Sequence, residues 1–324
     1  MTVSWQPSSD ARTASRRAAL LERARNFFSA RGVLAVDTPA LAHATASDPN
    51  VDSLSVRSSL SDRPLYLVTS PESAMKRLLA AGYPDIYSIC RVFRDAELGR
   101  RHELEFTMIE WYRHDYSLDE MTAETCALIA AVLDRPTLEH TVDRFEYRQV
   151  FEEETGIDPL HVAVADLADV ADADDRLRAA LGDEPDAWLD LVFATRVAPA
   201  FDPERITVVR YYPASQAALS RLCPDNPQLA DRFEVFYAGL ELANGYVELT
   251  DAHEQRRRIE ADLETRRAAG REAVPVDEPL LAALEHGLPE CAGVAVGFER
   301  LQMIYDATED IVDVIPFTLR NRDA

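Results

Sequence analysis

The chain has 324 residues, of which 47% are hydrophobic, and its formal net charge at pH 7 is −23. This size and apolar content predict a globular protein with a sizeable core, built as one large domain or two ordinary ones. No apolar run is long enough to span a membrane, and the first ten residues lack the hydrophobic stretch of a signal peptide. The acidic balance also disfavours broad nucleic-acid binding, which needs a basic face.

The cysteine and lysine contents are informative as well. Cys90, Cys126, Cys223 and Cys291 lie far apart and form no CxxC pair, which argues against structural zinc and favours reduced thiols in the cytoplasm. Lys76 is the only lysine, and every other basic side chain is arginine. This composition is typical of GC-rich coding or of a high-salt cytosol, so a salt-tolerant source is our hypothesis.

The first predicted element is a helix from about residue 10 to residue 31, which Gly32 ends. Its apolar stripe consists of Leu20, Leu21, Ala24, Phe27 and Phe28. Residues 33–41 follow as an extended segment that contains Pro39.

A second helix is predicted after a short strand at residues 65–69. Ser70 is the expected N-cap, Pro71 the first helical residue and Ala81 the last, with Gly82 closing the helix. Glu72 lies in the first turn, where a carboxylate complements the helix dipole. Taken alone, the segment is simply a capped helix.

Two strand-like segments, 88–94 and 106–113, flank a charged loop. The loop carries Arg94, Asp95, Glu97, Arg100, Arg101 and His102. Because strand side chains alternate, one face of the second strand carries Leu104, Phe106, Met108, Glu110 and Tyr112. A buried carboxylate is costly unless it is paired. Glu110 is therefore either neutralised by a structural arginine or placed to bind a cationic ligand.

The middle of the chain is predicted to be mostly helical. Ser117 and Glu120 form a capping box that begins a helix ending near Leu133. Residues 147–198 are mostly helical with acidic loops, and a strand follows at 206–212. The sequence defines no chemistry for residues 147–198.

Alternating hydrophobicity returns at residues 233–242, which we predict to be one strand. Glu241 and Glu248 lie seven residues apart around Asn244 and Gly245. One interpretation is a hairpin turn at this Asn-Gly pair with two solvated acids. The other is a magnesium site, because Mg²⁺ takes carboxylate oxygens while it bridges the phosphates of a nucleotide.

Residues 293–301 read Gly-Val-Ala-Val-Gly-Phe-Glu-Arg-Leu, a strand flanked by glycines that runs into a helix. A glycine such as Gly297 lets the backbone approach a ligand closely. Arg300, at the start of the helix, carries a guanidinium group that suits a phosphate.

The order of these segments resembles the catalytic domain of class II aminoacyl-tRNA synthetases. Residues 20–41 resemble motif 1, a dimer element, residues 86–113 resemble motif 2, and residues 293–306 resemble motif 3. The run Phe-Thr-Met-Ile-Glu-Trp-Tyr-Arg at 106–113 is similar to the lysyl subgroup, and more so to the truncated paralogues that modify elongation factor P.

The resemblance implies an α+β fold for residues 1–324, with an antiparallel sheet flanked by helices in a single domain. It covers nearly the whole chain, and we expect no anticodon-binding OB-fold domain before motif 1. An enzyme of this build can activate an amino acid, whereas tRNA is not an expected partner.

The resemblance also implies roles for individual residues. Arg94 contacts the α-phosphate and the amino-acid carboxylate, Phe106 stacks on adenine, and Arg300 meets the γ-phosphate. The other positions implied to bind ATP are Asp95, Ala96, His102, Glu103, Glu241, Leu242 and Gly297. The positions implied to bind the amino acid are Ser70, Glu72, Glu110, Tyr112, Asn244 and Glu248. By the same resemblance, Glu241 and Glu248 coordinate Mg²⁺.

Three positions depart from the pattern of lysyl-tRNA synthetases. Ala96 stands where the family has an acid, and Glu103 replaces an asparagine, so the consequence for nucleotide binding is open. Ala295 replaces a glycine, as it does in the elongation factor P ligases, and its methyl group is expected to reshape the amino-acid pocket toward β-lysine.

The predicted function is ATP-dependent activation of lysine or (R)-β-lysine and its transfer to a lysine side chain of elongation factor P. The predicted enzyme is a cytoplasmic homodimer that uses Mg²⁺. Two alternatives remain open: a lysine-activating ligase with another acceptor, and a catalytically silent paralogue that senses an amino acid or a nucleotide.

Overall fold

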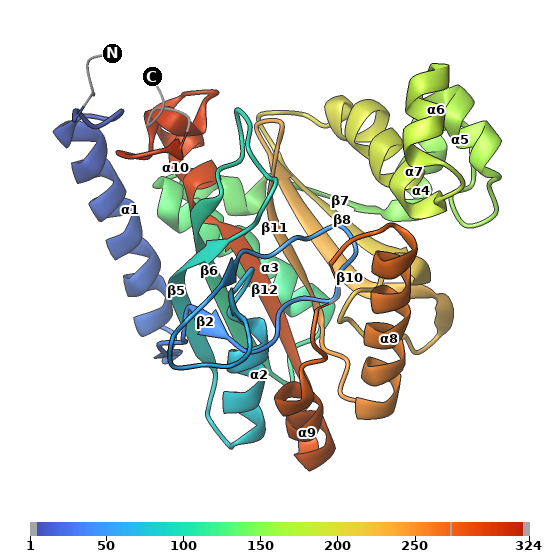
Figure 1. Cartoon of the computed structure of the whole chain (residues 1–324). Helices are drawn as coiled ribbons and strands as arrows, with labels where there is room; N and C mark the ends of the chain where they lie inside the picture. Colours follow the sequence, from blue (N-terminus) through green and yellow to red (C-terminus); the bar gives the residue numbers. More distant parts are fainter. Residues whose placement is uncertain (1–4, 273, 320–324) are drawn as a thin grey trace.

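The computed structural model describes residues 5–272 and 274–319, which form a central sheet with helices on both faces (Figure 1). The strands are β1 Leu34–Ala35, β2 Leu41–Ala42, β3 Ser55–Val56, β4 Leu65–Leu67, β5 Ile86–Phe93, β6 Glu105–His114, β7 Val142–Glu146, β8 Ile206–Pro213, β9 Leu222–Cys223, β10 Asn226–Tyr237, β11 Leu240–Val247 and β12 Cys291–Gly297. The α-helices are α1 Ala11–Ser29, α2 Glu72–Ala80, α3 Leu118–Leu133, α4 Tyr147–Thr155, α5 Val164–Val170, α6 Asp175–Leu181, α7 Pro185–Val192, α8 Ala252–Ala268, α9 Glu278–Gly287 and α10 Phe298–Asp306.

The main sheet has the strand order β1-β5-β6-β12-β11-β10-β8-β7, with β9 paired to β10. The strands from β5 to β8 in this order pair antiparallel, whereas the edge strands β1 and β7 run parallel to their neighbours. Strands β2, β4 and β3 form a separate small sheet. The expected α+β fold, an antiparallel sheet flanked by helices, is confirmed.

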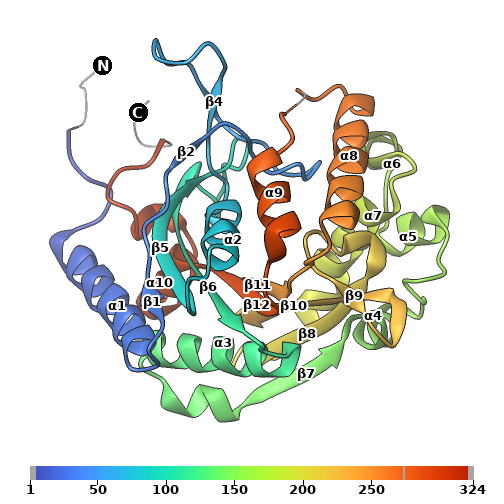
Figure 2. The same ribbon diagram turned by 90° about the horizontal axis from the view of Figure 1, so that it is seen from below.

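Helices cover the two faces of the sheet and form separate cores. On one face α1, α3 and α10 bury Phe28, Trp111 and Ile129 completely. On the other face α2, α9 and α8 follow one another across the sheet (Figure 2), and their buried side chains form a second core with Tyr112 of β6 and Cys291 of β12. The predicted alternation in β6 produces this split, because Trp111 enters the first core and Tyr112 the second. None of the helices in the described ranges is long and apolar enough to cross a membrane.

Helices α4 to α7 gather at one side of the sheet, beyond β8 (Figure 1). Their core contains Trp188 and Phe193 and packs on Val209 and Tyr212 of β8. This arrangement confirms the mostly helical prediction for residues 147–198.

The predicted helix starts are confirmed for α1 and α3 but wrong in detail for α2. The Ser117 hydroxyl accepts from the Glu120 N–H, and the Glu120 carboxylate accepts from the Ser117 N–H, which is the capping box. In α2 the carbonyl of Pro71 accepts the first intrahelical bond, from Met75 N–H at 3.0 Å. Pro71 is therefore the cap, in place of Ser70, and the helix begins at Glu72.

The alternating segment at 233–242 does not form one strand, which corrects the prediction. β10 ends at Tyr237 and β11 begins at Leu240, so Ala238 and Gly239 form a two-residue turn. Both turn residues have positive φ, 52° and 74°, as tight hairpins require. The sequence signal was weak because alanine rarely adopts this conformation. The alternative of a hairpin at Asn244 is also wrong, because Asn244 lies inside β11.

Candidate functional site

Four neighbouring strands carry the predicted site residues on one face of the sheet. Glu110 of β6 lies opposite Ala295 of β12, and Ala295 lies opposite Asn244 of β11. Asn244 in turn lies opposite Glu234 of β10. Paired residues in neighbouring strands point to the same face. The register thus brings Glu110 and Asn244 onto one floor, with the methyl group of Ala295 between them.

A β-bulge determines the face on which Glu241 lies. The register between β10 and β11 shifts between Val235 and Phe236, which leaves Leu242 without a partner on β10. Leu242 and Ala243 consequently both enter the core, and Glu241 lies on the same face as Asn244. In a regular strand, Glu241 and Glu248 would point to opposite faces, because they are seven positions apart.

A buried ion-pair network lies between α2 and the sheet, at the end of β11. Lys76 Nζ is 2.6 Å from Glu72 Oε1 and 2.5 Å from Glu248 Oε2. The Tyr246 hydroxyl donates to Glu72 Oε1 at 2.6 Å. On β6, two strands away from β11 in the sheet, the Tyr112 hydroxyl donates to Glu110 at 2.8 Å. The acidic cluster, as we call it, consists of Glu72, Lys76, Glu110, Tyr112, Tyr246 and Glu248.

Charge is unbalanced in the acidic cluster, which holds three carboxyl groups and one ammonium group. Burial raises the pKa of Glu110 well above its ordinary value, and Glu72 and Glu248 raise it further. Burial also raises the pKa of Glu248, to about 8, despite the nearby Lys76. Burial alone would lower the pKa of Lys76, but Glu248 and Glu72 raise it, so Lys76 is an ammonium ion. The unneutralised carboxyl groups suit an additional cation. Because the donor to Glu110 is a tyrosine, the alternative of a structural arginine is wrong.

Charged groups also gather at the other end of the floor, where α10 begins. Arg300 donates to the backbone carbonyl of Glu241 at 2.6 Å and lies 3.5 Å from its carboxylate. Its other terminal nitrogen is 2.8 Å from His102 Nε2. Burial and Arg300 lower the pKa of His102, so the neutral ring accepts this bond. The Arg94 guanidinium lies 5.3 Å from the ring centroid of Phe106. This end therefore presents two guanidinium groups to an anion.

The remaining predicted nucleotide residues lie mainly in the loop between β5 and β6. Asp95 N–H donates to the carbonyl of Asp52 at 2.8 Å. Ala96 is exposed and has a φ of 61°. Glu103 is buried and accepts from the N–H of Leu104 at 3.1 Å. Glu103 is thus turned into the protein rather than toward the mouth of the site.

Three other predicted residues have simple surroundings. Leu242 is buried in the core behind the floor. A Cβ atom added at Gly297 would meet only the Arg300 side chain, at 3.9 Å, so the space beside Gly297 is open. The Ser70 hydroxyl accepts from Glu72 N–H at 3.4 Å, at the start of α2.

Glu241 and Glu248 are not brought together. Glu241 lies beside Arg300, whereas Glu248 lies at the opposite end of β11 beside Lys76. Seven residues of strand span about 20 Å, too far for both carboxylates to bind one Mg²⁺ at about 2.1 Å. In the ranges that the structure describes, no group of three His, Cys, Asp or Glu residues could hold a metal ion. The geometry therefore corrects the expectation of a single ion shared by both carboxylates.

Sequence reasoning missed Lys76, Tyr246 and Arg232 as members of the site. Arg232 donates from Nε to the Asn244 side chain at 3.0 Å and from Nη2 to Glu234 at 2.5 Å, which orients Asn244. Lys76 did carry a signal, because it is the only lysine and lies one helical turn after Glu72. The sequence pattern gave no indication for Arg232, which the pairing of β10 with β11 brings to the site.

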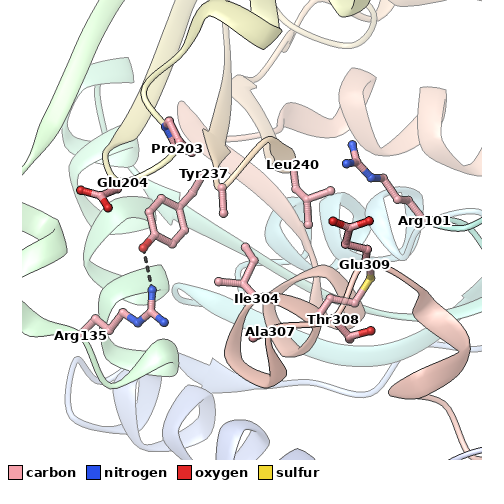
Figure 3. A pocket seen from close by; sticks show the side chains of 12 residues that line it. Arg101, Arg135, Pro203, Glu204, Tyr237, Leu240, Ile304, Ala307, Thr308 and Glu309 are labelled. Atoms are coloured by element: carbon pink, nitrogen blue, oxygen red, sulfur yellow. Dashed lines mark hydrogen bonds between the residues drawn. The ribbon is translucent and has the colours of Figure 1, made fainter.

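A cavity of about 550 Å³ lies elsewhere, beside the hairpin of β10 and β11 and the C-terminal end of α10 (Figure 3). Arg135 donates to the Tyr237 hydroxyl at 2.7 Å on one side of it, and Arg101 and Glu309 lie on the other. No residue of the acidic cluster lines this cavity. It is therefore separate from the acidic cluster.

The fold agrees with comparisons to known proteins. Residues 4–321 match the family model of tRNA synthetases class II (D, K and N), and the chain belongs to this family. It is 43% identical over 323 residues to the elongation factor P--(R)-beta-lysine ligase of Klebsiella pneumoniae subsp. pneumoniae, and the match covers 98% of each chain. The proteins of the same name from Sodalis glossinidius and Edwardsiella ictaluri are 43% and 44% identical, again over 98% of each chain. The predicted resemblance is confirmed.

Proposed function

We propose that this protein activates lysine or (R)-β-lysine with ATP and transfers it to a lysine side chain of elongation factor P. The acidic cluster is the observation that carries the proposal. It suits the amino groups of a diamino acid, while Arg94 and Arg300 suit its carboxylate and the phosphates of ATP. The names of the similar proteins, elongation factor P--(R)-beta-lysine ligase, support this choice of amino acid and acceptor.

The proposed reaction has two steps. A carboxylate oxygen of the amino acid attacks the α-phosphorus of ATP, pyrophosphate leaves, and an aminoacyl-adenylate forms. Arg94 and Arg300 stabilise the negative charge on the phosphates. The acceptor ε-amine then attacks the acyl carbon, an amide bond forms, and AMP leaves. No nucleophile from the protein is needed.

Mg²⁺ supplies positive charge on the phosphates when it enters with ATP. Glu241 is the residue we propose to hold it, because its carboxylate is exposed beside Arg300 at the phosphate end. We propose that Glu248, at the opposite end of β11 beside Lys76, binds the amino acid instead.

Pyrophosphate exchange tests the activation step. We expect lysine or β-lysine to drive exchange of labelled pyrophosphate into ATP, and exchange with neither amino acid would contradict the proposal. Mass spectrometry of elongation factor P after incubation with labelled amino acid and ATP tests the acceptor. If exchange occurs but elongation factor P stays unmodified, the acceptor is a different amine.

One observation favours the catalytically silent alternative. Ala96 has no carboxylate at the position where the family has an acid, and the residue is exposed with a left-handed backbone. Calorimetry that shows ligand binding without pyrophosphate release would support a sensor.

We also propose a cytoplasmic homodimer that associates through residues 20–41. Leu34 of β1 and Leu41 of β2 are 44% and 43% exposed. Edge strands with exposed apolar side chains favour pairing with another chain, which supports association through this segment. Sedimentation equilibrium tests the dimer, and a monomer at micromolar concentration would contradict it.

Replacing Ala295 by glycine should shift the preference between the two substrates toward α-lysine. The change removes a methyl group from the floor between Glu110 and Asn244, where the backbone of an α-amino acid then gains room. The ratio of kcat/KM for lysine to that for β-lysine should rise about tenfold, the lower end of the range for one methylene group. An unchanged ratio would show that Ala295 does not select the substrate.

Affinity for lysine should increase with pH up to about pH 8. Burial raises the pKa of Glu248 to about 8, so this carboxyl group holds a proton at lower pH. A ligand ammonium binds the ionised form better and must expel that proton. The lysine side chain itself stays charged up to about pH 10. KM for lysine should therefore fall by up to about tenfold per pH unit between about pH 6 and 8. A flat profile would contradict the assignment of Glu248.

A further inference from the structure

We propose that Lys76 is a positioning residue that holds the carboxyl groups of Glu72 and Glu248 side by side and favours the ionised form of Glu248, so that the pair receives an ammonium group of the substrate. The inference deepens the proposed function and rests on it. It assigns a role to a residue that the reaction scheme leaves unused.

Lys76 is buried although it is charged. Its side chain is 1% exposed, and Nζ contacts one carboxylate oxygen of Glu72 and one of Glu248, at 2.6 and 2.5 Å. The ring of Tyr246 lies 5.6 Å from the same nitrogen. The ammonium group therefore joins α2 to the end of β11 at the point where the two acids converge.

Glu248 keeps one oxygen that Lys76 does not contact. The side chain is 1% exposed, and Oε1 has no hydrogen-bond partner in the described part of the chain. Oε1 lies against Gly293, where an added Cβ atom would collide with it. A buried acceptor without a donor costs free energy, so this oxygen is ready for a donor that arrives with the ligand. Glu72, with a side chain 16% exposed, lies on the accessible side of the same pair.

Composition points to the same residue. Among the 34 lysine and arginine side chains, the one lysine is the residue that bridges the two acids. Arginine has a broad planar guanidinium with five donors in a fixed fork, whereas lysine has a compact ammonium. A compact cation can be shared by two carboxylates in a space closed to solvent. A bias toward arginine explains the rest of the chain but not this position.

When Lys76 is removed, we expect Glu248 to hold a proton instead of contacting the ammonium group. Burial and Glu72 raise the pKa of Glu248, and Lys76 opposes them. Without Lys76, Glu248 therefore keeps its proton to higher pH, and a ligand ammonium must expel it. The other titratable groups that face this pair are Glu110, Tyr112, Tyr246 and Cys291.

The test is the dependence of KM for lysine on pH in Lys76→Met, a change that shortens the unbranched side chain by one atom and removes its charge. We expect KM at about pH 7 to rise at least tenfold, and the midpoint of the KM–pH curve to move up by about one unit. The loss should appear in KM, with kcat within about threefold of wild type. Arg77→Met removes an exposed cation from the next position of the same helix, and it should leave the curve unchanged.

Several outcomes would overturn the role of Lys76. Identical KM–pH curves for wild type and Lys76→Met would overturn it. A KM for lysine that rises by the same factor at every pH would also overturn it, because a purely structural defect does not depend on the titration of Glu248. If Lys76→Met does not fold, the variant Lys76→Met/Glu248→Gln removes both charges, which buried ion pairs tolerate better than the loss of one. It should lose the pH dependence, and a wild-type curve would overturn the role. A wild-type protein without lysine-dependent exchange would instead overturn the proposed function, and the inference with it.

Discussion

Replacing Arg94 by alanine should lower lysine-dependent pyrophosphate exchange by at least about 100-fold, the loss typical of one electrostatic donor at a reacting centre. Arg94 follows β5 directly, and its guanidinium lies over the ring of Phe106. Its Nε is buried without a hydrogen-bond partner in the described residues, and its Nη1 lies 3.9 Å from the Glu97 carboxylate. As the carboxylate oxygen attacks, negative charge builds up on the α-phosphate oxygens and on the leaving pyrophosphate, and this cation stabilises that charge.

Arg100→Ala is the matched control for Arg94→Ala. Arg100 lies in the same loop, but its side chain is 67% exposed and pairs with Glu309 at 2.9 Å. Exposed pairs of this kind contribute little, so exchange should stay within about twofold of wild type. Equal losses in the two variants would mean that the loop as a whole, rather than the Arg94 guanidinium, supports activation.

Much of the site could be predicted because its residues lie in strongly patterned segments. The alternation from Phe106 to Tyr112 placed Glu110 on the buried face, and the structure confirms this, with Glu110 3% exposed. Motif 3 was equally clear, since β12 ends at Gly297 and α10 begins at Phe298. In each case a local period determines both the element and the direction of its side chains.

The rest of the site could not be predicted because it depends on contacts between segments that are distant in sequence. The spacing of Glu241 and Glu248 suggested one metal ion, but a continuous strand holds them at opposite ends. The bulge at Leu242 changes the face on which Glu241 lies. No pattern of residues in the sequence predicted this bulge. The pairing of Lys76 with Glu248 joins residues from α2 and β11, which only the folded sheet brings together.

The acidic cluster also depends on a close approach that only glycine allows. Replacing Gly293 by alanine should therefore raise KM for lysine by at least about 100-fold and lower the free energy of unfolding by about 3 kcal/mol, the upper part of the usual range for overpacking. The added Cβ would collide with Glu248 Oε1 and lie 2.7 Å from Tyr112 Cδ1. Both side chains are buried, at 1% and 2% exposure, so neither can turn into solvent. A shift of the tyrosine would also remove the hydroxyl that donates to Glu110.

Gly297→Ala is the matched control for the stability loss. Gly297 ends the same strand, its φ is −74°, and its nearest contact to an added Cβ is Arg300 at 3.9 Å. The two variants gain the same methyl group on β12, yet only Gly293→Ala should lower the melting temperature markedly. KM for ATP in Gly293→Ala should change by no more than about threefold, because Arg94 and Arg300 lie at the other end of the floor and distant sites respond independently. If KM for ATP and KM for lysine rose together, the two ends of the site would not be separate binding regions.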